Sequence, residues 1–291
     1  MAKADIAVLL ALAAAFFIAV GDVIHQRTAH EVTDESVGHL TLFLSLLRDR
    51  QWWLGSAVAG AGFAFQAAAL GLGSVLLVQA VLVTSLLFAL PISARQSNRP
   101  VTRWQWMWAV LLAGAVIVIV TVGNPTAGVS RASLETWVEV AAVLGPVVAL
   151  CLLGAKVWSG PASAVLLAVV SGTLWGLFAV LTKAVVDRLD VTSWTGVGQL
   201  LITPELYVWV VVAVAGTAMQ QASFRAGPLT ASLPTMTITE PMVACALGVV
   251  VLGETLRPGE TGWFILVIAV TVMIAATAAL ARGEAATREP V

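Results

Sequence analysis

The feature that most constrains this chain is a series of apolar runs of roughly 20 residues, the length with which a helix crosses a hydrocarbon core of about 30 Å. Apolar residues make up 59% of the chain and charged residues 11%, which excludes an ordinary soluble domain and a disordered chain. A backbone in lipid has to satisfy its own hydrogen bonds, and these runs are too long and continuous for barrel strands. The sequence therefore predicts an all-α, polytopic membrane protein.

Nine runs are expected to cross the membrane. Arginine and lysine gather in the segments that alternate spans place on one side, and the positive-inside rule makes that side cytoplasmic. The N-terminus is then external and the C-terminus cytoplasmic. The bias toward arginine over lysine and the many alanines favour a bacterial cell (inner) membrane. The approximate span limits are 4–24, 52–71, 73–94, 104–123, 136–156, 161–186, 205–225, 228–252 and 262–281.

The chain contains an internal repeat. Residues 7–11, Ala-Val-Leu-Leu-Ala, recur as residues 164–168, a shift of 157. A shift of 156 gives further matches: Trp53 with Trp209, Ala59-Gly60 with Ala215-Gly216, and Gly71 with Gly227. The near-constant shift across glycines, a tryptophan and span edges indicates two related units.

The repeat divides the chain into a first four-helix unit (1–130), a linker transmembrane helix (131–160) and a second four-helix unit (161–291). Five spans precede the second unit, and five is an odd number. The second unit must therefore enter the membrane from the opposite face. Such inverted repeats are typical of secondary transporters, in which two halves expose one midplane site to either side in turn.

A motif in the last third carries a family resemblance. The segments Glu240-Pro241-Met242-Val243-Ala244 and Leu252-Gly253-Glu254-Thr255-Leu256, with Gly248 between them and Gly262 after them, resemble the second-repeat signature of the EamA-like drug/metabolite transporter (DMT) superfamily. The nine-span plan, Trp52-Trp53-Leu54-Gly55, Gln66 and Lys183 look like its NIPA-type branch, whose members are associated with magnesium transport. The first repeat departs from this pattern, with Thr84-Ser85 in the Glu-Pro place and Ser93-Ala94-Arg95 in the Leu-Gly-Glu place. The resemblance implies transport of a small metabolite or a cation, Mg²⁺ included.

Glu240 is the leading candidate for the transport site because a charged carboxylate at mid-span costs about 3 kcal/mol or more. Pro241 removes a backbone donor beside it, and Thr237 adds a hydroxyl on a neighbouring turn. The functional interpretation is a protonatable or cation-binding carboxylate in a midplane cavity. The alternative is a protonated glutamate that packs within the bundle.

Four further polar residues lie inside expected spans. Asp22 is a candidate gate or coupling carboxylate, or a solvated group near a span end. Lys183 could pair with a carboxylate, bind an anionic substrate, or reach the interface with its long stem. Gln66 and Gln221 precede glycine breaks in matching places, and each could line the substrate path or join helices.

The sequence predicts no enzyme and no cofactor, since it lacks a phosphate-binding loop and any hydrolase motif. His25, His30 and His39 match no metal-ligand spacing, which leaves the metal open. The expected partners are a small-molecule or ion substrate and membrane lipids, with a homodimer allowed and no nucleic acid. Two alternatives to a secondary transporter stay open: a flippase for a lipid-linked head group, and a non-transporting membrane scaffold or regulator.

Overall fold

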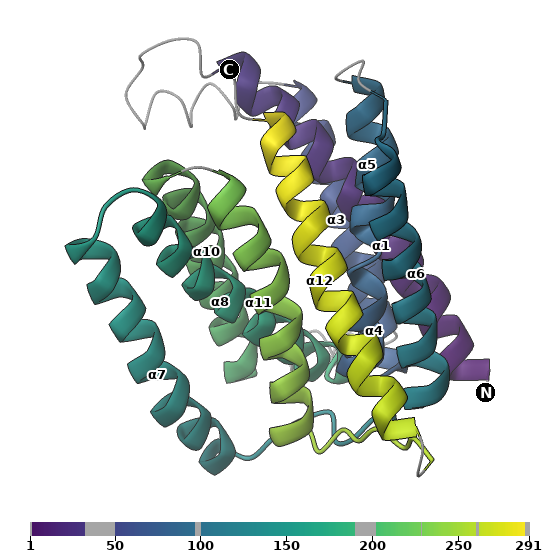
Figure 1. Cartoon of the computed structure of the whole chain (residues 1–291). Helices are drawn as coiled ribbons and strands as arrows, with labels where there is room; N and C mark the ends of the chain where they lie inside the picture. Colours follow the sequence, from purple (N-terminus) through teal and green to yellow (C-terminus); the bar gives the residue numbers. More distant parts are fainter. Residues whose placement is uncertain are drawn as a thin grey trace.

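The computed structural model describes residues 2–32, 50–96, 100–189, 202–227, 229–259 and 262–288, which form a bundle of helices (Figure 1). Within these ranges the one extended pairing is an isolated antiparallel bridge between Thr126 and Thr255. The helices are α1 (Ala2–Val32), α3 (Arg50–Leu72), α4 (Val75–Leu82), α5 (Ser85–Gln96), α6 (Arg103–Gly123), α7 (Leu134–Val157), α8 (Pro161–Asp187), α10 (Pro204–Ala226), α11 (Leu229–Val250) and α12 (Gly262–Arg288).

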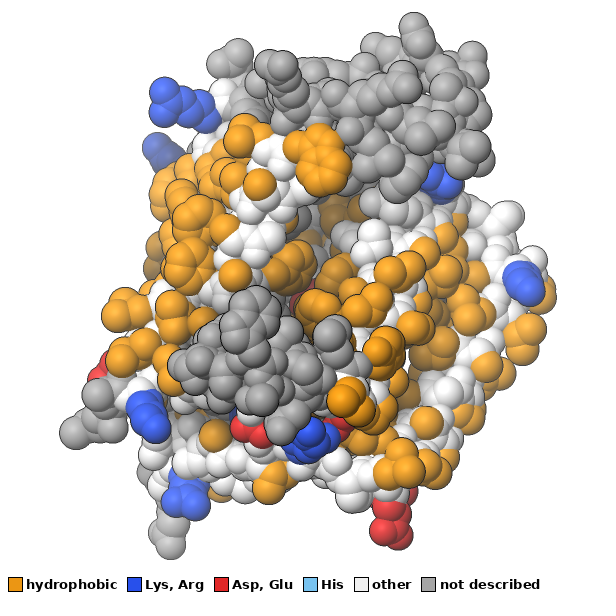
Figure 2. Space-filling model, turned by 180° about the vertical axis from the view of Figure 1, so that it is seen from behind, with side chains coloured by type: hydrophobic (Ala, Val, Ile, Leu, Met, Phe, Trp, Pro, Cys, Tyr) orange, Lys and Arg blue, Asp and Glu red, His pale blue; other side chains and the backbone are white. Residues whose placement is uncertain are grey.

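The described residues contain nine helical segments that are long and apolar enough to cross a membrane. They are 18 to 27 residues long, with mean hydropathies of 1.3 to 2.7. On the face that Figure 2 shows, hydrophobic side chains predominate among the described residues, and the charged side chains gather mainly toward the two ends of the bundle. The polytopic helical fold and the number of spans are thus confirmed. α1 continues past its expected limit, so His25 and His30 belong to a helix; their side chains, and all of His39, lie outside the described residues.

The third span is not one helix, which corrects the expected continuous run over residues 73–94. Val83 and Thr84 separate α4 from α5. Here i→i−3 bonds replace the α-helical pattern: Thr84 N–H donates to the Val81 carbonyl at 2.9 Å, and Leu86 N–H to the Val83 carbonyl at 3.3 Å. The Thr84 hydroxyl also donates to the Val81 carbonyl at 2.6 Å. A threonine can thus compete with the helix for its own backbone, which hydropathy does not reveal.

Corresponding helices of the two halves run in opposite directions (Figure 1). The first half consists of α1, α3, α4–α5 and α6, and the second of α8, α10, α11 and α12. α1 starts at the end of the bundle marked N, whereas its counterpart α8 runs toward that end; α6 and α12 are opposed in the same way. We call the end at which α1 begins the N-terminal end, and the opposite one, where α12 finishes, the C-terminal end. The fold is therefore two inverted four-helix repeats joined by α7.

The repeat-related alanines Ala7 and Ala164 make equivalent contacts, and both are 0% exposed. A Cβ atom on Gly73 would lie 2.9 Å from the Cβ of Ala7, and one on Gly227 would lie 3.1 Å from the Cβ of Ala164. Each contact joins the first helix of a unit to the turn between its second and third helices. The sequence match at a shift of 157 therefore reflects shared packing.

The two halves meet along α6 and α12, which pack against each other as an apolar seam. Ile119 of α6 clusters with Leu266 and Ala269 of α12. By contrast, α7 packs along α8 and contains no buried residue. The seam holds the halves together, while the linker helix stays at the periphery of the bundle.

Candidate functional site

The turn between α11 and α12 carries a glutamate into the interior. Gly253 adopts a left-handed conformation (φ 63°), and the N–H of Glu254 then donates to the carbonyl oxygen of Gly248 at 3.0 Å. A Cβ atom on Gly248 would lie 3.0 Å from Oε2 of Glu254, so this glycine leaves room for the carboxylate beside α11. As a result Glu254 is 0% exposed.

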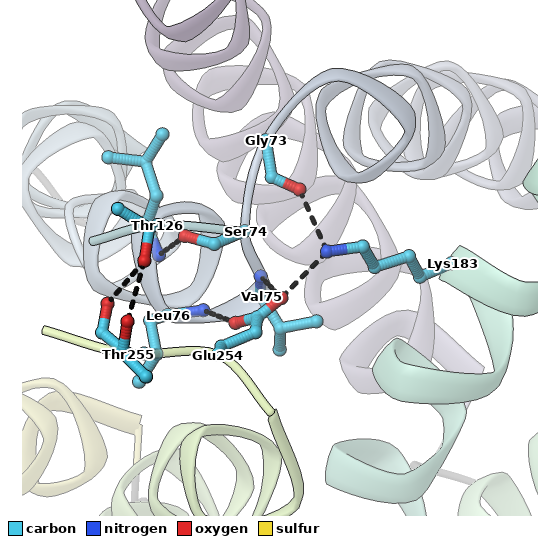
Figure 3. Close-up of polar contacts among 9 residues, drawn as sticks. Gly73, Ser74, Val75, Leu76, Thr126, Lys183, Glu254 and Thr255 are labelled. Atoms are coloured by element: carbon cyan, nitrogen blue, oxygen red, sulfur yellow. Dashed lines mark hydrogen bonds and ion pairs between the residues drawn. The ribbon is translucent and has the colours of Figure 1, made fainter. Parts of the chain in front are cut away.

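The carboxylate of Glu254 occupies the N-terminus of α4. Its Oε1 accepts the N–H of Val75 at 2.8 Å, and its Oε2 accepts the N–H of Leu76 at 3.0 Å (Figure 3). Ser74, the N-cap, accepts the N–H of Leu77 at 3.1 Å. Three donors that a helix start leaves unpaired are thereby satisfied. The negative charge also lies at the positive end of the α4 dipole, which stabilises both the helix and the carboxylate.

Lys183 of α8 completes this arrangement. Its ammonium donates to Oε1 of Glu254 at 2.7 Å and to the carbonyl oxygen of Gly73 at 3.1 Å, and the residue is 6% exposed. Buried charges persist when they are paired, and removing one partner of such a pair costs about 3–5 kcal/mol. The pair joins the α3–α4 turn of the first half to α8 and the α11–α12 turn of the second. We call the whole set the Glu254 cluster: Gly73, Ser74, Val75, Leu76, Lys183 and Glu254 (Figure 3).

Beside the Glu254 cluster, α3 and α8 touch at a glycine. A Cβ atom on Gly71 would lie 2.9 Å from Cγ1 of Val186, so the absence of a side chain lets α8 approach this closely. Val186 follows Lys183 by three residues and therefore lies on the same side of α8. A helix of the first half is thus in direct contact with a helix of the second half next to Lys183.

The crossover segment, residues 124–133, lies at the same end of the bundle. Thr126 N–H donates to the carbonyl oxygen of Thr255 at 2.9 Å, and the two hydroxyl oxygens are 2.7 Å apart. Further along, Arg131 forms an ion pair with Glu205 in the first turn of α10. The segment that connects the two repeats is therefore fastened to two elements of the second half.

Glu240, the leading candidate from the sequence, lies halfway along α11 and is half-buried. A Cβ atom on Gly172 would lie 3.1 Å from the backbone nitrogen of Glu240, and one on Gly176 would lie 2.8 Å from its carbonyl oxygen. These two glycines of α8, one turn apart, allow α11 to pack closely at Glu240. Lys183 follows Gly176 by seven residues, about two helical turns. The structure thus places Glu240 and Lys183 at different depths of the α8–α11 pair.

The threonines around Glu240 donate to their own helix. The hydroxyl of Thr237 donates to the carbonyl oxygen of Leu233 at 2.8 Å, and Thr235 and Thr239 make equivalent bonds. A hydroxyl has one donor and two acceptor positions. For a ligand, Thr237 therefore offers its oxygen lone pairs rather than its proton.

The remaining candidates have different surroundings. Gln66 is buried in α3, whereas Gln221 is exposed on α10, so their matched places in the sequence do not give them equivalent environments. Asp22 belongs to α1, and its side chain lies outside the described residues. Among the candidates whose side chains are described, Lys183 alone belongs to the Glu254 cluster.

Sequence reasoning missed Glu254 as a site residue, and it ranked Gln79 below Gln66 and Gln221 among the amides inside spans. Glu254 stands in the Leu-Gly-Glu turn that carries the family resemblance, and a lysine inside a span requires a carboxylate partner; together these signals could have identified it. Gln79 of α4 is 2% exposed, and its amide nitrogen finds no hydrogen-bond partner among the described residues. Such an unpaired buried donor is rare enough to need a specific explanation. The described residues contain no group of three or more His, Cys, Asp or Glu that could hold a metal ion.

Comparison with known proteins finds a relative of nearly equal length. An uncharacterized protein of Corynebacterium glutamicum is 39% identical over 277 residues, which cover 95% of each chain. No protein-family model matches the sequence. No solved structure matches it.

Proposed function

We propose that this chain, which belongs to the same family as the Corynebacterium glutamicum protein, is a secondary transporter of a small metabolite or a cation. Two inverted halves would expose a midplane site to either side of the cell membrane in turn. Protons are the simplest coupling ion, through the carboxylate of Glu240. The N-terminal end of the bundle would face outward and the C-terminal end the cytoplasm. The resemblance to the drug/metabolite transporter superfamily supports the same function.

The observation that carries this proposal is a helix break in one half and an in-helix proline at the corresponding position of the other half. A shift of 156 aligns Thr84 and Ser85 with Glu240 and Pro241. The third span of the first half breaks at Val83–Thr84, and the third span of the second half contains Pro241 at the matching point. α11 remains helical across Pro241, but the proline removes one backbone donor there. Apolar spans that a break or a proline weakens at equivalent places of inverted repeats are the best sequence-level indicator of a transport site.

The break at Thr84 and the Glu240-Pro241 pair also lie at the same depth. Gly248 of α11 approaches Val75 of α4, with 3.4 Å between the Cβ position of the glycine and the Cβ of the valine. The two helices run in opposite directions and advance about 1.5 Å per residue. From that contact, Thr84 is nine residues along the third span, just beyond α4, and Glu240 is eight residues back along α11, so both lie roughly 12–14 Å from it. Both positions are near the middle of their spans.

Gln79 supports a polar path that leads to this depth, since it lies four residues, about 6 Å, from the Gly248–Val75 contact on the way to Thr84. It follows Val75 by one turn and therefore lies on the same side of α4, the side that faces α11. Its unpaired amide nitrogen points to a hydrogen-bond partner that is not part of the described protein. A transported solute with an oxygen acceptor, or a water molecule that accompanies it, would satisfy this donor. Glu240 and Gln79 are then the second-half and first-half residues of one site.

The test is uptake by purified protein in liposomes, with a panel of metabolites and divalent cations and an imposed pH gradient. We expect at least one solute to accumulate when the pH gradient is present. We expect Glu240→Gln to abolish the gradient-driven part, because the amide cannot exchange a proton. Glu139→Gln, which neutralises an exposed carboxylate on α7, is the matched control and should transport normally.

Two outcomes would count against the proposal. A folded Glu240→Gln protein with wild-type uptake and unchanged pH dependence would remove Glu240 from the site. Absence of flux for every solute in the panel, with intact protein in the liposomes, would favour the non-transporting scaffold.

A further inference from the structure

We propose that the contact of Lys183 with Glu254 and Gly73 is the gate that closes the transport path at the N-terminal end of the bundle. The gate opens when α8 moves away from the α3–α4 turn and Lys183 leaves its two oxygen partners. This inference rests on the proposed transport function, since a gate needs a path to close. To the proposed transport function, the inference adds three features: the moving residue (Lys183), the contact that separates (α8 with the α3–α4 turn) and the end of the bundle that opens (the N-terminal end).

The position of the Glu254 cluster between the halves is the first argument. Lys183 belongs to the second half, while Gly73 and the α4 N-terminus belong to the first. Any movement of α8 that opens this end must separate Lys183 from Gly73, while the α11–α12 turn with Glu254 stays bonded to α4. The neighbouring contact of Gly71 with Val186 must part with it, because it joins the same two halves on the same side of α8.

The unequal fastening of the two charges is the second argument. Glu254 keeps two backbone donors of α4 when Lys183 leaves. The turn that carries it is also bonded to the crossover segment through Thr255 and Thr126. In the described structure, the ammonium of Lys183 donates to two atoms only, Oε1 of Glu254 and the carbonyl oxygen of Gly73. Lys183 is therefore the member that can leave while Glu254 stays hydrogen-bonded at the start of α4.

The chemistry of the parting surface is the third argument. The seam between α6 and α12 is apolar, and opening it to water would expose hydrocarbon side chains such as Ile119 and Leu266. At Lys183 the groups that separate are an ammonium, a carboxylate and a carbonyl, which water can solvate once they part. A polar contact is thus suited to repeated opening, whereas the apolar seam is suited to remain closed as the axis of the motion.

Thiol labelling tests the gate without a known substrate. Ala179 lies one turn inside Lys183 on the same side of α8 and is 0% exposed. In a background with Cys151→Ala and Cys245→Ala, Ala179→Cys reports whether a charged methanethiosulfonate reagent passes the gate. Ala168→Cys, also 0% exposed on α8 but nearer its other end, is the matched control reporter.

We expect Lys183→Met to accelerate labelling of Ala179→Cys on the order of tenfold or more. The reason is that a protein that rests in a closed conformation typically populates its open conformation to a few per cent or less, which leaves room for a large increase. Labelling of Ala168→Cys should stay unchanged. If Lys183→Met does not fold, Gly71→Val provides a second route, since its side chain pushes α8 away at Val186 and leaves the charges in place. It should give the same selective acceleration.

Two results would overturn the gate. The first is a folded variant in which labelling at both reporters stays at the parent rate. The second is an equal rise at both reporters, which would make Lys183 a strut of the whole bundle. Neither result depends on uptake, so the gate can fail while transport is found, and uptake can fail while the selective opening is seen.

Discussion

A Cβ atom on Gly128 would lie 1.8 Å from the carbonyl oxygen of Leu252, closer than any two such atoms can approach. The crossover segment therefore passes the α11–α12 turn at backbone contact distance. The next residue uses this proximity, since the N–H of Val129 donates to the same Leu252 carbonyl at 2.8 Å. The crossover segment, which leads from the first repeat to α7, is thus packed against the end of the bundle at which Glu254 is buried.

Gly128→Ala should destabilise the protein, because the added methyl group forces the crossover segment away from Leu252. Overpacking of this kind typically costs about 1–3 kcal/mol, and here it also weakens the hydrogen bond from Val129. We expect a fall of several degrees in the midpoint of thermal unfolding, measured on purified protein. Gly114→Ala in α6 is the control, because a Cβ there meets nothing within 4 Å. Equal midpoints for the two variants would show that the segment can move aside freely.

Glu254→Met should destabilise the protein more than Lys183→Met. Without Glu254, the ammonium of Lys183 and the N–H groups of Val75 and Leu76 lose their acceptor. Without Lys183, the carboxylate keeps both N–H donors and the α4 dipole. We expect a difference of at least about 1 kcal/mol in the free energy of unfolding. The double variant should fall between the two single variants, because it removes the unpaired lysine. The reverse order would mean that the α4 N-terminus contributes little to holding Glu254.

A disulfide across the gate should stop transport. Gly71→Cys with Val186→Cys, in the background lacking Cys151 and Cys245, joins α3 to α8 where their side-chain positions almost touch. Oxidation should abolish uptake of a solute identified by the liposome panel, and reduction should restore it. The control is Gly216→Cys with Leu174→Cys, whose Cβ positions are 3.5 Å apart within the second half. Continued uptake with the first disulfide fully formed would exclude parting of α3 and α8.

Gln79→Leu should make the protein more stable and less active. Leucine has a similar volume, and it removes a buried donor that has no partner among the described residues. Removing such a group recovers about 1–3 kcal/mol of desolvation penalty. The midpoint of thermal unfolding should therefore rise, while the rate of uptake should fall. Lower stability in this variant would show that Gln79 serves packing rather than a ligand.

The two ends of the chain should be accessible from opposite sides of the membrane. The described chain begins and finishes at opposite ends of the bundle (Figure 1). The positive-inside rule places the C-terminal end in the cytoplasm. Epitope tags in intact and permeabilised cells measure this directly. An N-terminal tag that is detected only after permeabilisation would reverse the assigned orientation.

The spans followed from the sequence because a membrane-crossing helix has to be long and apolar, which is a local property. The inverted arrangement followed as well, since it needs only the repeat and an odd number of spans. The break at Val83–Thr84 did not follow. A threonine hydroxyl that bonds a carbonyl three residues earlier is common in continuous helices, so its presence alone does not indicate an interruption.

The polar residues also divide into those that the sequence identified and those that only the structure identified. The sequence marked Lys183 and Glu240 because ionisable groups inside spans are rare. It pointed to Glu254 only through the Leu-Gly-Glu turn, and composition assigns that turn to the membrane surface, away from a lysine inside a span. The partner depends on where that turn folds, and Gly248 and Gly253 decide this through space and backbone conformation.

The order of the residues alone thus determined that nine segments, all found to be helical in the described part of the chain, are long and apolar enough to cross a bilayer. It also determined that the second set enters from the other face, because hydropathy and the parity of crossings are read along the chain. Only the tertiary structure decided that the carboxylate of Glu254 accepts the N–H of Val75, 179 residues earlier in the chain, and pairs there with Lys183. Such contacts depend on distances across the bundle, which are set by how closely glycines let the backbones approach.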